Sequence, residues 1–65
     1  MVVSRLKQLM ETNGVTLRDL MAKTGLSNET VLRARSEKIV KCRLETLVTI
    51  AAALQCKTKD LYDET

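Results

Sequence analysis

Residues 16–33 read TLRDLMAKTGLSNETVLR, and they are the most informative part of the sequence about the fold. Thr16 is a typical helix N-cap residue, and Asp19, three positions later, gives a weaker form of the capping box. Gly25 ends this first short helix, because glycine readily adopts the left-handed conformation of a helix C-cap. Ser27 then caps a second helix almost at once. The stretch therefore predicts two short helices joined by a tight turn.

The two helices and their turn predict a helix-turn-helix over about residues 16–35. Leu26, directly after the turn, pins the corner to the core. The second helix, about residues 27–35, turns Val31 and Ala34 inward. We expect its outward-facing residues to be Asn28, Glu29, Thr30, Leu32 and Arg33. Asn and Arg side chains suit adenine and guanine edges in a major groove about 12 Å wide, and a Thr methyl can pack on a thymine methyl.

The flanking residues predict further helices. Apolar residues at helical spacing predict a helix over residues 2–12, which ends at the Asn13-Gly14 pair. Residues 36–42 are interpreted as a connecting loop. After this loop, the apolar pattern predicts another helix that is buried on much of its circumference. Its apolar residues are Leu44, Leu47, Val48, Ile50, Ala51 and Leu54.

A last short helix, capped by Thr58, is expected to bury Leu61 and Tyr62. The chain has 65 residues, which is room for one domain. We therefore predict an all-α fold, a compact five-helix bundle that forms a single domain over residues 1–65.

The composition argues against several classes of function. A single aromatic residue disfavours a protein that stacks single-stranded bases. There is no histidine, and Cys42 and Cys56 make no zinc motif, so we interpret both as small core residues in a reducing compartment. No paired-carboxylate or phosphate-loop motif is present. We predict a protein that is not an enzyme and that has no cofactor and no metal site.

Charge is distributed unevenly along the chain. The net charge is +3, yet residues 28–43 carry five cations and two carboxylates, whereas residues 44–65 carry two cations and four carboxylates. A concentration of positive charge in the middle of the chain suits a surface that faces phosphates. No apolar run approaches the roughly 20 residues that span a membrane. We expect a cytoplasmic protein without a membrane partner.

The order and spacing of several motifs resemble the Cro/C1-type (Xre-like) helix-turn-helix family of phage and bacterial regulators. The resemblance runs from RLKQLM at residues 5–10 to DLY at residues 60–62. Its most specific parts are the pair Thr16 and Leu20, KTGLS at residues 23–27, and LETL at residues 44–47 followed by Ile50, Ala51, Ala53 and Leu54. It implies a small stand-alone member with a lambda repressor-like fold, and a sequence-specific regulator of double-stranded DNA, chiefly a repressor.

The resemblance also assigns roles to individual positions. It implies base contacts by residues just after the cap of the second helix, which here are Asn28, Glu29, Thr30 and Arg33. It implies phosphate contacts at the start of the first helix and in the loop before the long helix. The matching residues are Thr16, Arg18, Lys38, Lys41 and Arg43.

One recognition helix covers only a few base pairs, so useful affinity calls for a homodimer on two half-sites. We expect the contact between copies to come from the region of Leu61 and Tyr62, or to form only on DNA. An alternative stays open. Leu17 and Leu32 stand where the family has polar residues, and together they would form an apolar patch of a protein-interaction or antitoxin-like module.

Overall fold

The computed structural model describes residues 1–64, which form short elements connected by tight turns. In chain order these elements are β1 (Val2–Ser4), α1 (Leu6–Thr12), α2 (Leu17–Thr24), α3 (Asn28–Ala34), the 3₁₀ helix η1 (Glu37–Lys41), α4 (Leu44–Ala53), the 3₁₀ helix η2 (Thr58–Leu61) and β2 (Tyr62–Glu64).

The helix-turn-helix predicted from residues 16–35 is confirmed, and local hydrogen bonds explain its boundaries. The Thr16 side chain accepts a bond from the Asp19 amide, and the Asp19 carboxylate accepts one from the Thr16 amide, both at 3.1 Å. Gly25 has φ +74° and donates its amide proton to the Met21 carbonyl. The Ser27 hydroxyl accepts the Thr30 amide at 3.2 Å. Helix α2 therefore begins and ends at its capping residues, and α3 begins at its own cap, Ser27.

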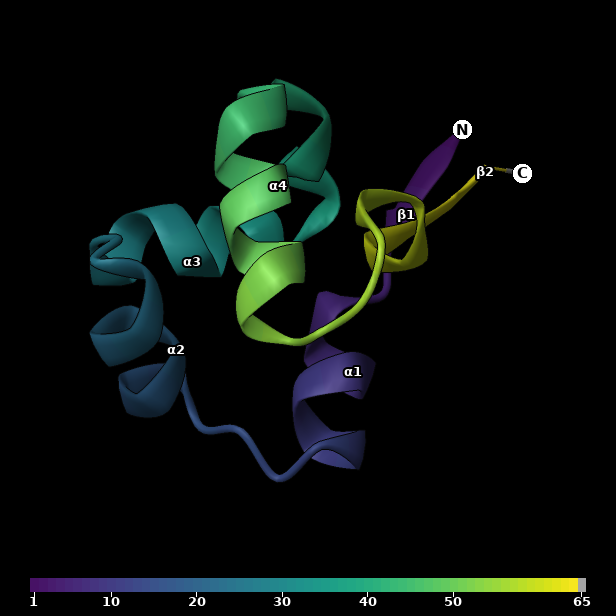
Figure 1. Cartoon of the computed structure of the whole chain (residues 1–65). Coiled ribbons are helices and arrows are strands. Elements are labelled where there is room, and N and C mark those ends of the chain that lie inside the picture. The colour runs from purple at the N-terminus through teal and green to yellow at the C-terminus, as the bar shows by residue number, and fades with distance from the viewer. Residues whose placement is uncertain (65) are drawn as a thin grey trace.

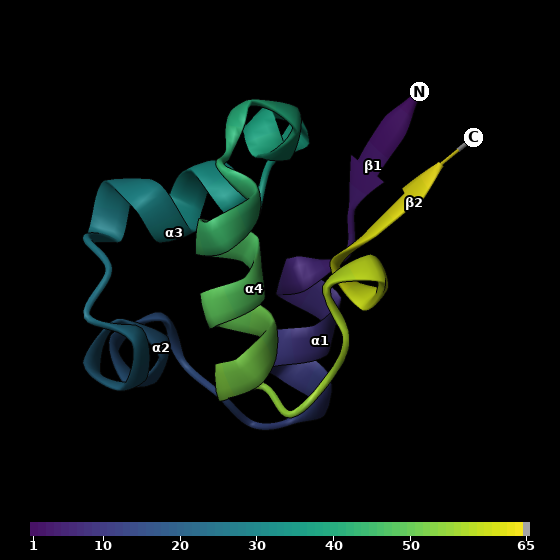
Figure 2. The same cartoon turned by 45° about the horizontal axis from the view of Figure 1, so that its top comes forward.

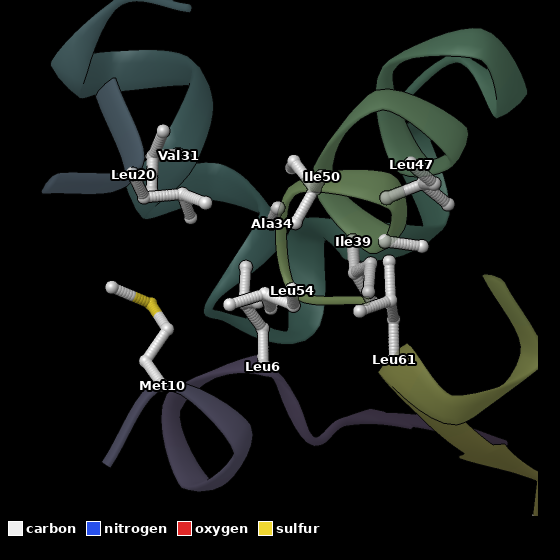
Figure 3. Packing of buried hydrophobic residues seen from close by; sticks show 11 residues of the cluster. Leu6, Met10, Leu20, Val31, Ala34, Ile39, Leu47, Ile50, Leu54 and Leu61 are labelled. Carbon is white, nitrogen blue, oxygen red and sulfur yellow. The ribbon is translucent and has the colours of Figure 1, made fainter. Parts of the chain in front are cut away.

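Helix α4 lies at the centre of the molecule. In both views the α2–α3 pair lies on one side of it, while α1 and the terminal strands lie on the other (Figures 1 and 2). The buried side chains meet between these elements, with Leu20 of α2 next to Val31 of α3 (Figure 3). The core consists of Leu6, Met10, Leu20, Val31, Ala34, Ile39, Leu47, Ile50, Ala51, Leu54 and Leu61.

The prediction of an all-α five-helix bundle is wrong in its details. The described residues form four α-helices, two 3₁₀ helices and a two-stranded sheet. Strand β1 pairs with β2 in antiparallel fashion, with Val3 opposite Asp63. Residues 2–4 are therefore a strand, and the predicted first helix begins only at Leu6. The reason is tertiary, because the Arg5 amide bonds the Leu61 carbonyl at 2.8 Å and the chain cannot continue as a helix through this point.

Two further segments differ from the prediction. The predicted loop over residues 36–42 contains η1, which buries Ile39. The last helix is a 3₁₀ turn that begins at Thr58, and the Asp60 carboxylate accepts the Lys57 amide in front of it. Leu61 is buried as predicted, whereas Tyr62 has already entered β2 and is half-buried.

Helix α4 buries one face and not most of its circumference. Leu47, Ile50 and Ala51 are buried as predicted, but Leu44 is 69% exposed and Val48 is 50% exposed. Nothing among the described residues packs over this side of the helix densely enough to cover them. No described helix is long and apolar enough to cross a membrane.

Candidate nucleic-acid interface

The outer face of α3 borders an open groove, which we call the α3 groove. Val31 and Ala34 are fully buried, so the helix presents its remaining side chains outward. Three of the four predicted base-contacting residues lie here, together with one predicted phosphate contact. The lining residues of the α3 groove are Asn28, Glu29, Leu32, Arg33, Ser36 and Lys38.

A second open groove lies between α3 and the start of α4, and we call it the basic groove. It brings Thr30 together with two cations from the segment that enters α4. Its lining residues are Leu26, Thr30, Arg33, Lys41, Cys42, Arg43, Glu45 and Thr46. The structure thus places predicted base-contacting and phosphate-contacting residues side by side.

Arg33 lines both grooves and therefore stands at the centre of the candidate interface. One turn earlier, the Glu29 carboxylate lies 3.7 Å from its guanidinium. Because both side chains are substantially exposed, this pair contributes little to stability. A guanine edge or a phosphate can replace Glu29 as the partner of Arg33 at small cost.

The cations of η1 reach the interface because Ser36 turns the chain there. The Ser36 hydroxyl donates to the Arg33 carbonyl at 2.9 Å and accepts the Lys38 amide at 3.2 Å. These two bonds end α3 and start η1, so Lys38 lies beside α3 and lines the α3 groove. Ser36 was not predicted as a site residue, although a serine next to a helix end is a recognisable capping signal.

Thr16 and Arg18 line neither of the two grooves. Both are exposed at the start of α2, and the Thr16 backbone amide is already bonded to the Asp19 carboxylate. The Thr16 amide and hydroxyl lower the pKa of the exposed Asp19 side chain, because their hydrogen bonds favour the charged carboxylate. A phosphate at this end of α2 would therefore meet Arg18, because Asp19 already engages the amide and the hydroxyl of Thr16.

Thr30 is partly committed to the start of α3. Its hydroxyl lies 2.8 Å from the Ser27 hydroxyl, and the residue is only half-exposed. It lines the basic groove, on the other side of Arg33 from Asn28. The structure therefore separates Thr30 from Asn28 and Glu29, while Arg33 lines the basic groove together with Thr30.

Cys42 lines the basic groove as an uncharged side chain. Both cysteines are free thiols that are half-buried at the edge of the core. Burial raises the pKa of the Cys42 thiol, against a smaller opposing effect of Arg33. The thiol therefore stays protonated at neutral pH and adds no negative charge to the basic groove. No group of His, Cys, Asp or Glu side chains within residues 1–64 could hold a metal ion.

Leu17 and Leu32, which the sequence offered as an exposed apolar patch, have different environments. Leu17 is half-buried and packs against the core, whereas Leu32 is 44% exposed and lines the α3 groove. The expectation that Leu17 contributes an exposed apolar surface is therefore wrong. The prediction missed a different group of exposed apolar residues, Val40, Leu44 and Val48 on η1 and α4.

Comparison with known protein families agrees with this geometry. A family profile described as the Cro/C1-type HTH DNA-binding domain matches residues 5–63. The chain belongs to this family. It is accordingly a DNA-binding domain, and the family is generally non-enzymatic. No curated protein and no solved structure gives a significant match.

Proposed function

We propose that this Cro/C1-type domain binds double-stranded DNA in a sequence-specific manner and regulates transcription, with α3 in the major groove. One observation carries the proposal. The outer face of α3 presents Asn28 and Arg33 in an open groove, and cations from η1 and the start of α4 lie on both sides of that helix. Base-reading groups flanked by phosphate-binding groups are what a recognition helix requires.

The geometry supports a division of labour among these residues. Asn28 and Arg33 carry the hydrogen-bonding groups suited to adenine and guanine edges. Glu29 holds Arg33 in the free protein and can accept a bond from cytosine. Phosphate contacts belong to Lys38, Lys41 and Arg43, joined by Thr16 and Arg18 at the start of α2. Thr30 offers its methyl group from the basic groove.

We propose that the domain acts as a repressor, because this role requires no activity other than DNA binding. Occupying a promoter blocks transcription without any further activity, and DNA affinity alone achieves it. The family resemblance supports a source in a phage, a mobile element or a bacterium. A regulator of this kind works in the cytoplasm, where bacterial and phage DNA is found.

We also propose a homodimer, but with a contact surface different from the region of Leu61 and Tyr62 that was expected from the sequence. Leu61 is fully buried and cannot contact a second copy. Val40, Leu44 and Val48 are instead at least half exposed, and a groove lined by Val2, Ile39 and Tyr62 adjoins the first two of them. We assign this apolar surface to the contact between two copies bound on neighbouring half-sites.

The dimer contact is tested with Val48→Glu, and with Thr49→Glu as the control of equal charge at the adjacent exposed position. On a duplex with two half-sites, Val48→Glu should lose the affinity gained over a single half-site, while Thr49→Glu retains it. Both variants should bind a single half-site alike. If both variants bound the duplex with two half-sites equally well, the contact between copies would not lie on this apolar surface.

DNA binding itself is tested by fluorescence anisotropy on random-sequence duplex DNA at about 50 and about 200 mM salt. Affinity should fall steeply with salt. The variant Lys41→Ala/Arg43→Ala should bind more weakly and lose about two units of salt slope, roughly one per lost phosphate contact. The control Lys7→Ala/Lys59→Ala removes the same charge from α1 and η2 and should keep the slope.

A wild-type protein that does not bind duplex DNA even at the lower salt concentration would contradict the proposal. A protein-interaction module would then be the better interpretation, and the exposed Leu32 would be its first candidate contact. Equal loss of salt slope in both double variants would mean that charge alone, and not the basic groove, supplies the affinity.

A further inference from the structure

Among the described residues, Leu32 is the only one with an apolar side chain that lines the α3 groove. Its neighbours there, Asn28, Glu29, Arg33, Ser36 and Lys38, are all polar or charged. A single exposed leucine is ordinary on a protein surface and by itself indicates nothing. Its position is what matters, because Asn28 lies one turn before it on the same helix and Arg33 lies directly after it.

Leu32 has no structural role that explains its presence. The inward face of α3 is filled by Val31 and Ala34, both fully buried. Leu32 is not among the residues that form the core or pack against it, whereas Leu17 is. It also lies outside the surface of Val40, Leu44 and Val48 that we assign to the contact between copies. Its side chain points instead into the groove that faces DNA in the proposed function.

We propose that Leu32 contacts the C5-methyl group of one thymine in each half-site and so specifies an A·T pair at that position. This inference rests on the proposed DNA-binding function. The thymine methyl is the apolar group that distinguishes base pairs in the major groove, and an apolar side chain recognises it by contact. The polar neighbours hydrogen-bond to the adjacent base edges, and Leu32 adds a contact that hydrogen bonds cannot provide.

The size of the effect follows from the area involved. Burying one methyl-sized group contributes roughly a fourfold gain in affinity. We therefore expect a fourfold loss per half-site when the methyl group is removed. The loss should appear at a single thymine, because one leucine side chain covers about one methyl group.

The experiment begins with a duplex selected from a random pool by the wild-type protein. Each thymine of the selected half-site is then replaced, one at a time, by uracil, which removes only the methyl group. Affinities are measured by anisotropy for the wild type, for Leu32→Ala, and for Val3→Ala as a matched control. Val3 in β1 is an apolar residue exposed to a similar degree as Leu32, and it lines neither the α3 groove nor the basic groove.

The wild type and Val3→Ala should each lose about fourfold in affinity when one particular thymine is replaced, while Leu32→Ala shows no further loss there. Circular dichroism should give the same melting curve for Leu32→Ala and the wild type, because an exposed side chain is removed. An equal uracil penalty in all three proteins would overturn the inference and leave sequence-specific binding intact. Failure of the pool to yield any preferred sequence would overturn the inference and the proposed specificity together.

Discussion

The helix-turn-helix and the terminal region of this small protein are held together in different ways. Around α2 and α3, the side-chain bonds that fix the helix ends join residues two to four positions apart, as Thr16 and Asp19 do. In the terminal region the bonds span the chain. The Ser4 hydroxyl donates to the Ala34 carbonyl at 2.6 Å, and the Arg5 guanidinium lies 2.6 Å from the Asp63 carboxylate. One region is specified locally, and the other exists only once the chain has folded.

This difference explains what the sequence could predict. The caps at Thr16 and Ser27 and the glycine at Gly25 act within one helical turn, so the helix-turn-helix was predicted with nearly correct ends. Strand β1 was mistaken for helix because its conformation depends on β2, sixty residues away. A pattern of apolar residues near the N-terminus carries no sign of that partner.

The candidate site divides in the same way. The helical period placed Asn28, Glu29 and Arg33 on the outer face of the helix, and the family resemblance implied that they contact bases. Which cations join each groove depends on the path of η1, which no local pattern predicted. The exposure of Leu44 and Val48 was missed for a related reason, since periodicity indicates which residues share a helix face but not which face another element covers.

The largest expected effects on stability come from cavities in the core, one beneath the helix-turn-helix and one beneath the terminal region. Leu20 of α2 and Leu61 of η2 are both fully buried, so Leu20→Ala and Leu61→Ala should each cost about 2–5 kcal/mol. A core of this size supplies only about 3–5 kcal/mol, so either change should leave much of the protein unfolded.

Urea titration followed by two probes checks this prediction. Circular dichroism reports the helices, and the fluorescence of Tyr62, the only tyrosine, reports the terminal region. The two transitions should coincide in the wild type and in both variants, as expected of one cooperative unit. A Leu61→Ala protein that loses the tyrosine signal before its helicity would show that the two regions unfold separately.

The next largest effect concerns the local bonds of the helix-turn-helix. In the capping box of α2, the side chains of Thr16 and Asp19 each accept a hydrogen bond from the backbone amide of the other. Thr16→Ala removes the side-chain half of this box, so the free energy of unfolding should fall by about 1 kcal/mol. Thr49→Ala is the control, because Thr49 lies within α4 and its hydroxyl only returns to the Glu45 carbonyl. The midpoint of urea unfolding should shift for the first variant and stay nearly constant for the second. Equal shifts would mean that the cap has no special value.

The smallest effect is expected for the ion pair between the terminal segments. Arg5 and Asp63 are each about half exposed, so Arg5→Ala should cost less than about 1 kcal/mol, and the cost should shrink as salt is added. DNA affinity should change no more than it does for Lys7→Ala, which removes the same charge from α1. If Arg5→Ala lowered the free energy of unfolding as much as Thr16→Ala does, the ion pair of the terminal region would be as stabilising as the local cap, against this prediction.

The most direct test of the central claim, that α3 and its flanking cations form the DNA interface, is a nuclear magnetic resonance titration of the nitrogen-15-labelled protein with duplex DNA. Amide signals should shift most in residues 28–33 and 38–43, then at 16–18, and least in β1 and β2. Shifts concentrated at the terminal strands, with α3 unaffected, would contradict the account.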